Sequence, residues 1–139
     1  MSRRSFLNML FVLGTPLVAM MGGCGQKETA MRNEIIAYEK SVRGHSGQID
    51  VTHLVEKYIK MGDSMETAKE ILLKNGFSVY EYSVEEVKNR RDVRITCRIQ
   101  AEYKIRGGLL HRVDIVIFLG NSPESEIVDY MLAKVNHQP

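Results

Sequence analysis

The most regular pattern of hydrophobic and polar positions lies between residues 93 and 105. Apolar and polar residues alternate there, so an extended chain has one hydrophobic face and one polar face. The apolar set is Val93, Ile95, Cys97, Ile99, Ala101, Tyr103 and Ile105, and the polar set is Arg94, Thr96, Arg98, Gln100, Glu102 and Lys104. A second alternating stretch, His111 to Leu119, places Val113, Ile115, Ile117 and Leu119 on one face. The two stretches predict antiparallel strands with one buried face and one solvated face.

The register of these two strands depends on the loop around Gly107 and Gly108. A two-residue Gly107-Gly108 turn places the core residue Ala101 opposite the charged Asp114. A three-residue loop, Arg106-Gly107-Gly108, keeps core residues together and provides a left-handed position for glycine. It pairs Ala101 with Val113, Ile99 with Ile115, Cys97 with Ile117, and Glu102 with Arg112. We predict this second register.

Two helices are predicted before the strands. The first is capped by Asp50, ends at Gly62 and has an apolar stripe of Val51, Leu54, Val55, Tyr58 and Ile59. The second opens at Asp63 and Ser64, with Glu66 in the capping-box position three residues after Asp63, and turns Ala68, Ile71 and Leu72 inward. Asn75-Gly76-Phe77 then ends it, because Gly76 adopts the left-handed conformation and Phe77 packs back on the last turn.

Three other segments have weaker patterns. Met31, Ile35, Tyr38 and Val42 share one face of a short amphipathic helix. The stretch from Phe77 to Val84 alternates imperfectly as a strand, and a charged loop from Glu85 to Arg91 follows it. The segment from Glu126 to Val135 leaves two alternatives open. Ser122-Pro123-Glu124 is typical of a helix start, whereas Ile127, Asp129, Met131 and Ala133 alternate as in a strand.

The first 25 residues have the three parts of a secretory signal, which are a positive start, an apolar stretch and a small-residue end. The apolar run, Met9 to Met21, is shorter than the ~20 residues of a membrane-spanning helix and is interrupted by Pro16. Met21-Gly22-Gly23-Cys24 resembles a bacterial lipobox. We therefore predict that Cys24 carries acyl chains such as palmitate and becomes the first residue of the mature protein. An ordinary signal peptide with a coincidental cysteine is the alternative.

The export signal also has a specific feature at its positive end. Ser2-Arg3-Arg4-Ser5-Phe6-Leu7 resembles the twin-arginine consensus, with Arg3 and Arg4 as the signal motif. This resemblance implies folding in the cytoplasm before export, and the general secretory route is the alternative.

These patterns predict an α+β protein, in which a helix pair packs on one face of a three- to four-stranded antiparallel sheet. The 139 residues suffice for one domain. We divide them into a signal peptide (1–23), a tether with a short amphipathic helix (24–49) and a small α+β domain (50–139).

Charge and cysteine usage limit the classes of function. The net charge is +2, but Arg3 and Arg4 leave with the signal peptide, so 17 basic residues balance 17 acidic ones in the rest. A neutral domain offers no global attraction for nucleic acid, and we expect none as a partner. With Cys24 lipidated, Cys97 has no partner for a disulfide within the chain.

Candidate chemistry is sparse. His45, His53, His111 and His137 are scattered without the spacing of a helical metal site, and no second cysteine stands near Cys97. Gly107-Gly108 is not followed by the helix of a phosphate-binding loop. We therefore predict no enzyme, catalytic residue, metal or cofactor, and interpret Cys97 as a small buried hydrophobic residue. An enzyme that uses Cys97 or His111 is the remote alternative.

The polar face of the predicted sheet is the best candidate for a partner-binding surface. Four cations share it, namely Arg94, Arg98, Lys104 and Arg112. The planar guanidinium group suits carboxylates and phosphates, so the face would bind an acidic protein surface or anionic lipid head groups. The alternative is that this charged face is solvated and binds no partner.

One resemblance adds to this interpretation. The helix pair and the strands that follow it resemble BamE-like (SmpA-type) outer-membrane lipoproteins and the repeat of β-lactamase inhibitor protein. The resemblance lies in the spacing Gly62-x-Ser64-x-x-x-Ala68-x-x-x-Leu72 and in the helix exit Asn75-Gly76-Phe77. The resemblance covers roughly Val51 to Leu119 and implies a strand, rather than a helix, in the last segment. BamE-like proteins scaffold the machinery that inserts outer-membrane barrels, and the inhibitors bind an enzyme through the sheet face.

The expected function is accordingly that of a membrane-anchored envelope lipoprotein, a non-enzymatic binding or scaffold module with a protein partner. An inhibitor-type module that binds an envelope enzyme is the alternative. Gly25, rather than Asp, follows the lipidated cysteine. By resemblance to the usual sorting rule, this implies the periplasmic face of the outer membrane in a host with two membranes. In a host with one membrane, the protein would stay on the outer face of the cytoplasmic membrane.

Overall fold

The computed structural model describes residues 29–42, 47–89, 97–108, 111–122 and 125–139. It is an α+β fold whose described part forms a five-stranded antiparallel sheet in the order β1-β5-β4-β3-β2. The strands are β1 (Gln48–Asp50), β2 (Ser78–Glu81), β3 (Cys97–Gly107), β4 (Arg112–Gly120) and β5 (Tyr130–Gln138). The helices are α2 (Ala30–Ser41), α3 (Thr52–Val55), α4 (Met65–Lys74) and α5 (Val84–Asn89). The predicted α+β class is confirmed, and β1 adds a fifth strand to the three to four predicted.

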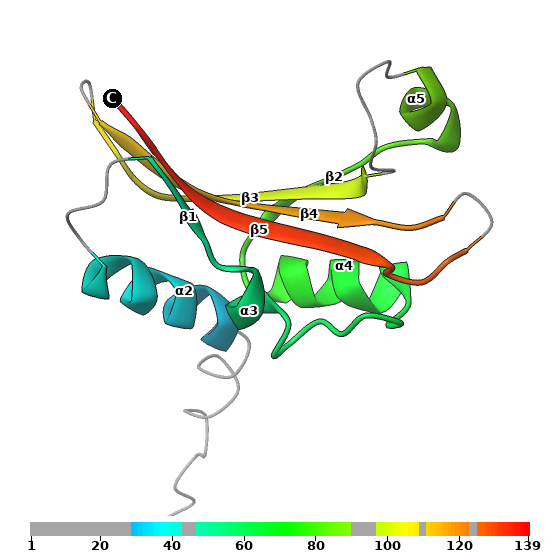
Figure 1. Cartoon of the computed structure of the whole chain (residues 1–139), viewed down its shortest axis with the longest axis horizontal. Helices are drawn as coiled ribbons and strands as arrows, with labels where there is room; N and C mark the ends of the chain where they lie inside the picture. Colours follow the sequence, from blue (N-terminus) through cyan, green and yellow to red (C-terminus); the bar gives the residue numbers. More distant parts are fainter. Residues whose placement is uncertain (1–28, 43–46, 90–96, 109–110, 123–124) are drawn as a thin grey trace, which may run out of the picture.

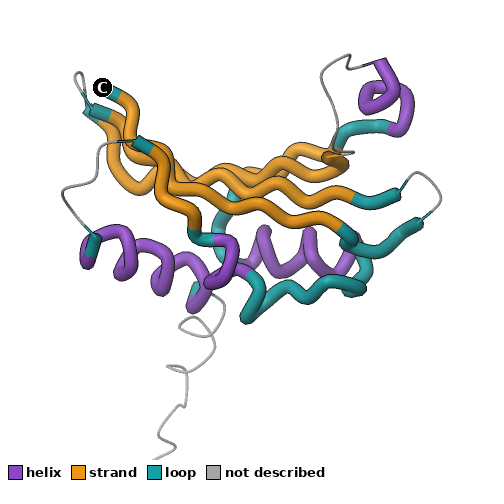
Figure 2. The backbone as a smooth tube through the Cα atoms, viewed as in Figure 1, coloured by secondary structure: helices purple, strands orange, loops and turns teal. Residues whose placement is uncertain are grey.

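The helices are distributed unequally over the two faces of the sheet. Figure 1 shows α2, α3 and α4 as a layer beneath it, while α5 lies on the other side, at the end of β2. The tube in Figure 2 shows the same two layers and leaves the upper face of the strands open along most of its length. The fold therefore has one covered face and one open face.

The hydrophobic core fills the space between the sheet and the helix layer. The inward residues of β4 are fully buried, as the alternation predicted; they are Val113, Ile115, Ile117 and Leu119. Met31 and Ile35 of α2 are also fully buried in this core. The core and the sheet thus extend into the segment 24–49, for which we predicted a tether with a short amphipathic helix, because α2 and β1 both pack against the rest of the protein.

Helix α4 begins and ends through local backbone chemistry. Ser64 caps it, because its Oγ accepts a hydrogen bond from the Thr67 backbone N–H at 3.1 Å. The capping pair is thus Ser64 and Thr67, not the predicted Asp63 and Glu66. At the other end Gly76 has a φ of +80°, and the Phe77 N–H donates to the Leu72 carbonyl at 3.1 Å. This confirms the predicted exit, in which glycine closes the last turn.

The first predicted helix is shorter than its apolar stripe suggested. Helix α3 spans Thr52–Val55 only, and the Asp50 carboxylate accepts a hydrogen bond from the Thr52 N–H at 2.9 Å. Beyond it the chain follows tight turns, and the Gly62 N–H donates to the Val128 carbonyl at 2.8 Å. This long-range bond holds the segment against the start of β5, so the chain leaves the helix early.

The predicted register of the β3–β4 hairpin is wrong by four residues. Ala101 lies opposite Ile117 instead of Val113, and Gly107 still pairs, with Arg112. A shift by an even number keeps every side chain on its predicted face, so alternation alone cannot detect it. The observed register carries the ladder up to Gly107, whereas the predicted one ends it at Ile105. An irregularity between Lys104 and Arg106 places Arg106 opposite Val113.

Two further segments bear on the sequence predictions: in one the structure selects between two alternatives, and in the other it differs from the prediction. The last segment forms strand β5, whose Met131, Ala133 and Val135 are buried, so the strand alternative is the observed one. Residues 84–89 form α5 rather than the predicted loop. Ser83 Oγ accepts from the Glu86 N–H at 3.1 Å while Glu86 Oε2 accepts from the Ser83 N–H at 2.7 Å. This reciprocal capping box explains the helix start and was present in the sequence.

Candidate binding surface

The open face of the sheet presents outward side chains in rows that run across the strands. The antiparallel pairs align Tyr80 with Gln100, Gln100 with Phe118, and Phe118 with Leu132. Three of these four side chains are aromatic or aliphatic, although no described helix layer covers them (Figure 1). Tyr80 is 53% exposed. An ordered apolar row on an open face is typical of a surface that contacts another molecule.

A hollow of about 500 Å³ lies at the β2 and β3 end of this row. We call it the β2–β3 hollow; its lining residues are Ser78, Val79, Tyr80, Tyr82, Gln100 and Glu102. Tyr80 and Tyr82 stand two positions apart at the end of an extended strand, which places both rings on one face. Their ring centroids are 4.5 Å apart at an interplanar angle of 66°. The hollow is thus lined by two aromatic rings and a carboxylate.

Hydrogen bonds hold the polar groups of the hollow in one arrangement. The Tyr82 hydroxyl donates to Gln100 Oε1 at 2.9 Å, and Gln100 Nε2 donates to Glu102 Oε1 at 2.7 Å. The Tyr80 hydroxyl donates to Glu86 Oε1 at 3.2 Å. These bonds orient the Gln100 amide and connect each tyrosine hydroxyl to a carboxylate, directly for Tyr80 and through Gln100 for Tyr82.

The cations predicted to bind a partner do not form one patch in the described part of the chain. Arg94 lies outside the described residues. Arg98 donates from Nε to the Tyr82 carbonyl at 3.1 Å and lies 3.6 Å from a Glu81 carboxylate oxygen. Lys104 is six residues further along β3, about 20 Å away at the rise of a strand. Arg112 is paired with Asp114 at 2.5 Å.

The three described cations of this prediction therefore do not line the β2–β3 hollow. Each of these described cations is directed to a neighbour on the same chain or lies at the hairpin end of the sheet. The β2–β3 hollow between them contains Glu102 and is adjacent to Glu86. The residues that the sequence analysis missed are Tyr80, Tyr82 and Gln100, and the i, i+2 spacing of the two tyrosines was the available signal.

A second polar cluster lies at the opposite, hairpin end, beneath the sheet. Glu39 of α2 is fully buried and accepts hydrogen bonds from two guanidinium nitrogens of Arg106, at 2.6 and 3.3 Å. His137 Nε2 lies 3.6 Å from the same carboxylate, and the His137 ring is 5.9 Å from that of His111. This cluster attaches α2 to the sheet by a charge-assisted pair, which is a structural arrangement.

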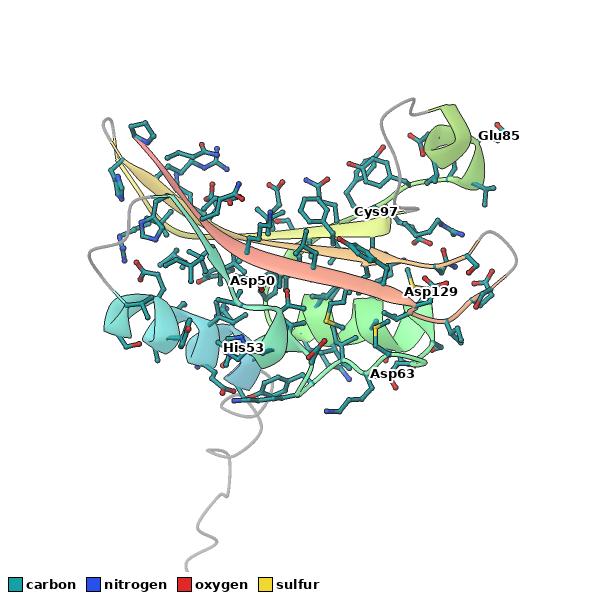
Figure 3. All side chains as sticks on the ribbon, in the orientation of Figure 1. Asp50, His53, Asp63, Glu85, Cys97 and Asp129 are labelled. Atoms are coloured by element: carbon teal, nitrogen blue, oxygen red, sulfur yellow. The ribbon has the colours of Figure 1, made fainter. Side chains whose placement is uncertain are left out.

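The residues of the catalytic alternative are far from each other. Cys97 begins β3, is partly buried and has its Sγ 3.2 Å from the Ile99 carbonyl. His111 lies beyond the other end of β3, about 30 Å away by strand rise. Figure 3 shows Cys97 at the same end of the molecule as Glu85 of α5. Among the described residues, no group of three or more histidine, cysteine, aspartate or glutamate side chains is placed to hold a metal ion.

Comparison with known proteins yields no relative, since no family model, curated protein or solved structure matches this chain. None of the helices in the described ranges combines the length and the apolar character needed to cross a membrane.

Proposed function

We propose that this protein is a non-enzymatic binding module of the cell envelope, anchored by lipid at Cys24, which contacts a protein partner through the open face of its sheet. The observation that carries the proposal is the row from Tyr80 to Leu132, with the β2–β3 hollow at its end, on a face that no described helix layer covers. A protein surface of this composition resembles the centre of an interface, where aromatic residues are enriched.

The anchoring part of the proposal rests on the N-terminal residues. The lipobox-like Met21-Gly22-Gly23-Cys24 and the signal pattern before it favour a lipoprotein, exported through the twin-arginine route by Arg3 and Arg4. Acyl chains contribute about 0.8 kcal/mol per buried methylene, so several chains hold a soluble domain at a bilayer. The resemblance of residues 62–77 to BamE-like lipoproteins supports the same location.

The geometry gives no support to a catalytic pair of Cys97 and His111. Cys97 begins β3 and His111 lies beyond its other end, whereas a nucleophile needs its base within hydrogen-bond reach. An inhibitor-type module remains the second candidate, because the β2–β3 hollow suits a side chain that projects from another protein. The identity of the partner, found by the crosslinking experiment below, distinguishes a scaffold from an inhibitor.

The contact surface is tested by photo-crosslinking in the intact envelope. A photoreactive phenylalanine analogue replaces Phe118 on the open face in one strain and Glu70, an exposed residue of α4, in the control. We expect a discrete crosslinked protein from position 118 alone, identified by mass spectrometry. Equal crosslinking at both positions, or none at 118, would contradict the use of the open face.

Anchoring is tested separately by fractionation. Cys24→Ala should move the protein out of the membrane fraction and remove the mass of the acyl chains from the mature chain. Cys97→Ala is the matched control, since it removes the other cysteine and should leave both unchanged. A Cys24→Ala protein with unaltered mass and membrane association would disprove the lipid anchor.

A further inference from the structure

The two tyrosine rings in the β2–β3 hollow offer a site for a positive charge. Aromatic rings carry negative potential on their faces and attract guanidinium or ammonium groups within about 6 Å. Tyr80 and Tyr82 meet edge to face, with 66° between their planes, so the two rings present differently oriented surfaces to the hollow. Because the site lies at the surface and Tyr80 is half exposed, a side chain from another protein can reach it.

Glu102 supplies a carboxylate at the same place. None of the ion pairs formed by the described residues includes Glu102, whose Oε1 accepts a hydrogen bond from Gln100 Nε2. Its cross-strand neighbours on the open face are Ser78 and Val116, which carry no charge. The carboxylate therefore lies beside the rings without a basic neighbour on either adjoining strand.

The nearest described cations are directed elsewhere. Lys104, two positions along β3, extends over Gly107 at the hairpin end, where its Nζ occupies the space that a glycine Cβ would need. Lys134 of β5 donates to Gln48 Oε1 at 3.1 Å. Arg98 is engaged with Glu81 and the Tyr82 carbonyl. The charge of Glu102 is thus left for a group outside these contacts.

From these observations we infer that the β2–β3 hollow binds an arginine side chain of the partner protein, between Tyr80, Tyr82 and the Glu102 carboxylate. The inference rests on the proposed function, whose partner it characterises. Arginine suits the site because its planar group stacks on aromatic rings and pairs with a carboxylate in a fixed geometry. The partner surface is basic, opposite to the acidic surface that the cations of β3 and β4 suggested.

The test measures binding of short peptides to the mature lipidated protein in non-ionic detergent micelles. The probe is a fluorescently labelled, blocked hexapeptide that alternates threonine and arginine, so its arginines share one face of an extended chain. Its matched control replaces each arginine by citrulline, which keeps the shape and removes the charge. We expect the arginine peptide to bind at least about fivefold more tightly by fluorescence anisotropy, since an exposed ion pair and a cation–π contact together give this order of effect.

Substitutions in the hollow test which residues bind the arginine peptide. Glu102→Gln conserves the size of an exposed side chain and should weaken the arginine peptide about fivefold without changing the citrulline peptide. Tyr80→Leu should weaken it about twofold to fivefold by removing a ring. Glu70→Gln, an exposed carboxylate on α4, is the control and should change nothing. Equal binding of the arginine and citrulline peptides, or no effect of Glu102→Gln, would overturn the inference, as would tighter binding of a threonine–glutamate peptide.

Failure of this inference and failure of the proposed function give different results. If position 118 crosslinks a partner while the arginine peptide shows no preference, the open face binds a protein but the hollow does not bind arginine. If position 118 also crosslinks nothing, the proposed function fails together with the inference.

Discussion

The two faces of the sheet are built from the same strands but are stabilised differently. On β4, Ile115 and Ile117 point to the helix layer and are fully buried, whereas Val116 and Phe118 point to the open face. Val116 is nevertheless only 8% exposed. Neighbouring side chains on the sheet shield it, since no described helix layer does (Figure 2). The covered face thus depends on packing between layers, and on the open face exposed residues such as Tyr80 are available for contact. Substitutions on the two faces should therefore have different consequences.

The largest effect on stability is expected for a substitution on the covered face. Ile117 lies between Ala101 of β3 and Ala133 of β5, so few atoms on either side can fill a cavity at this position. Ile117→Ala should lower the free energy of unfolding by about 2–5 kcal/mol, measured by urea denaturation. Leu73 of α4 is 51% exposed, so Leu73→Ala should change the free energy of unfolding by no more than about 0.5 kcal/mol. Equal effects of the two would contradict the position of the core.

The next effect concerns the buried charge beneath the hairpin. Glu39 is fully buried with Arg106, so Glu39→Gln leaves the guanidinium with a weaker acceptor. Hydrogen bonds to charged groups contribute about 1.5–3 kcal/mol, and we expect a loss in this range. Glu56→Gln, at an exposed position, is the control. A variant as stable as the wild type would show that the pair does not attach α2 to the sheet.

A smaller effect is expected at the end of α4. Gly76 has a φ of +80°, and a Cβ there would lie 2.7 Å from Nη1 of Arg32. Gly76→Ala should cost about 1–2 kcal/mol for the left-handed conformation. It should also displace the Arg32 guanidinium from the Tyr103 ring, which lies 4.8 Å away. Gly108→Ala, where a Cβ meets nothing closer than 4.0 Å, should cost less; a reversed order would contradict the turn geometry.

The pH dependence on the helix side should be smaller still. Hydrogen bonds from Lys57 and then Tyr58 hold the pKa of Glu34 below its ordinary value of 4.5. A carboxyl with a lowered folded-state pKa stabilises the protein above its unfolded pKa and loses this contribution as the pH falls. Between pH 7 and pH 3 the wild type should therefore lose more stability than Glu34→Gln. A larger loss in the variant would refute the Lys57 and Tyr58 contacts.

The smallest effect on stability is expected on the open face. Tyr80 is 53% exposed, so Tyr80→Leu should change the free energy of unfolding by no more than about 0.5 kcal/mol. The same variant should nevertheless weaken the arginine peptide. Urea denaturation and anisotropy on one protein preparation compare the two directly. A loss of stability comparable to that of Ile117→Ala would mean that Tyr80 serves the fold rather than binding.

The correct sequence predictions concern features that depend on neighbours a few residues away. Alternation identified the two faces of β3 and β4, because side chains on a strand point alternately to opposite sides. Gly76 and Phe77 marked the end of α4, because the left-handed turn and its hydrogen bonds form within six residues. Ser83 and Glu86 carried an equally local signal for α5, which the charge of residues 85–91 obscured.

The features that were missed depend on contacts between distant segments. The hairpin register differs by an even number of residues, which alternation cannot distinguish. The last segment was compatible with helix and strand, and pairing with β4 along Arg112–Gly120 made it a strand. Glu39 reads as a solvated residue of an amphipathic helix until the irregularity near Lys104 brings Arg106, 67 positions away, into contact with it.

The candidate surface combines both kinds of information. The sequence by itself determined that Tyr80 and Tyr82 share one side of the chain, and that Gln100 and Glu102 share one side of theirs, because a strand repeats every two residues. Only the tertiary structure decided that these two pairs meet, since the β2–β3 register places Tyr80 beside Gln100 and Ser78 beside Glu102. Local periodicity sets the direction of a side chain, whereas pairing across the sheet sets its neighbours.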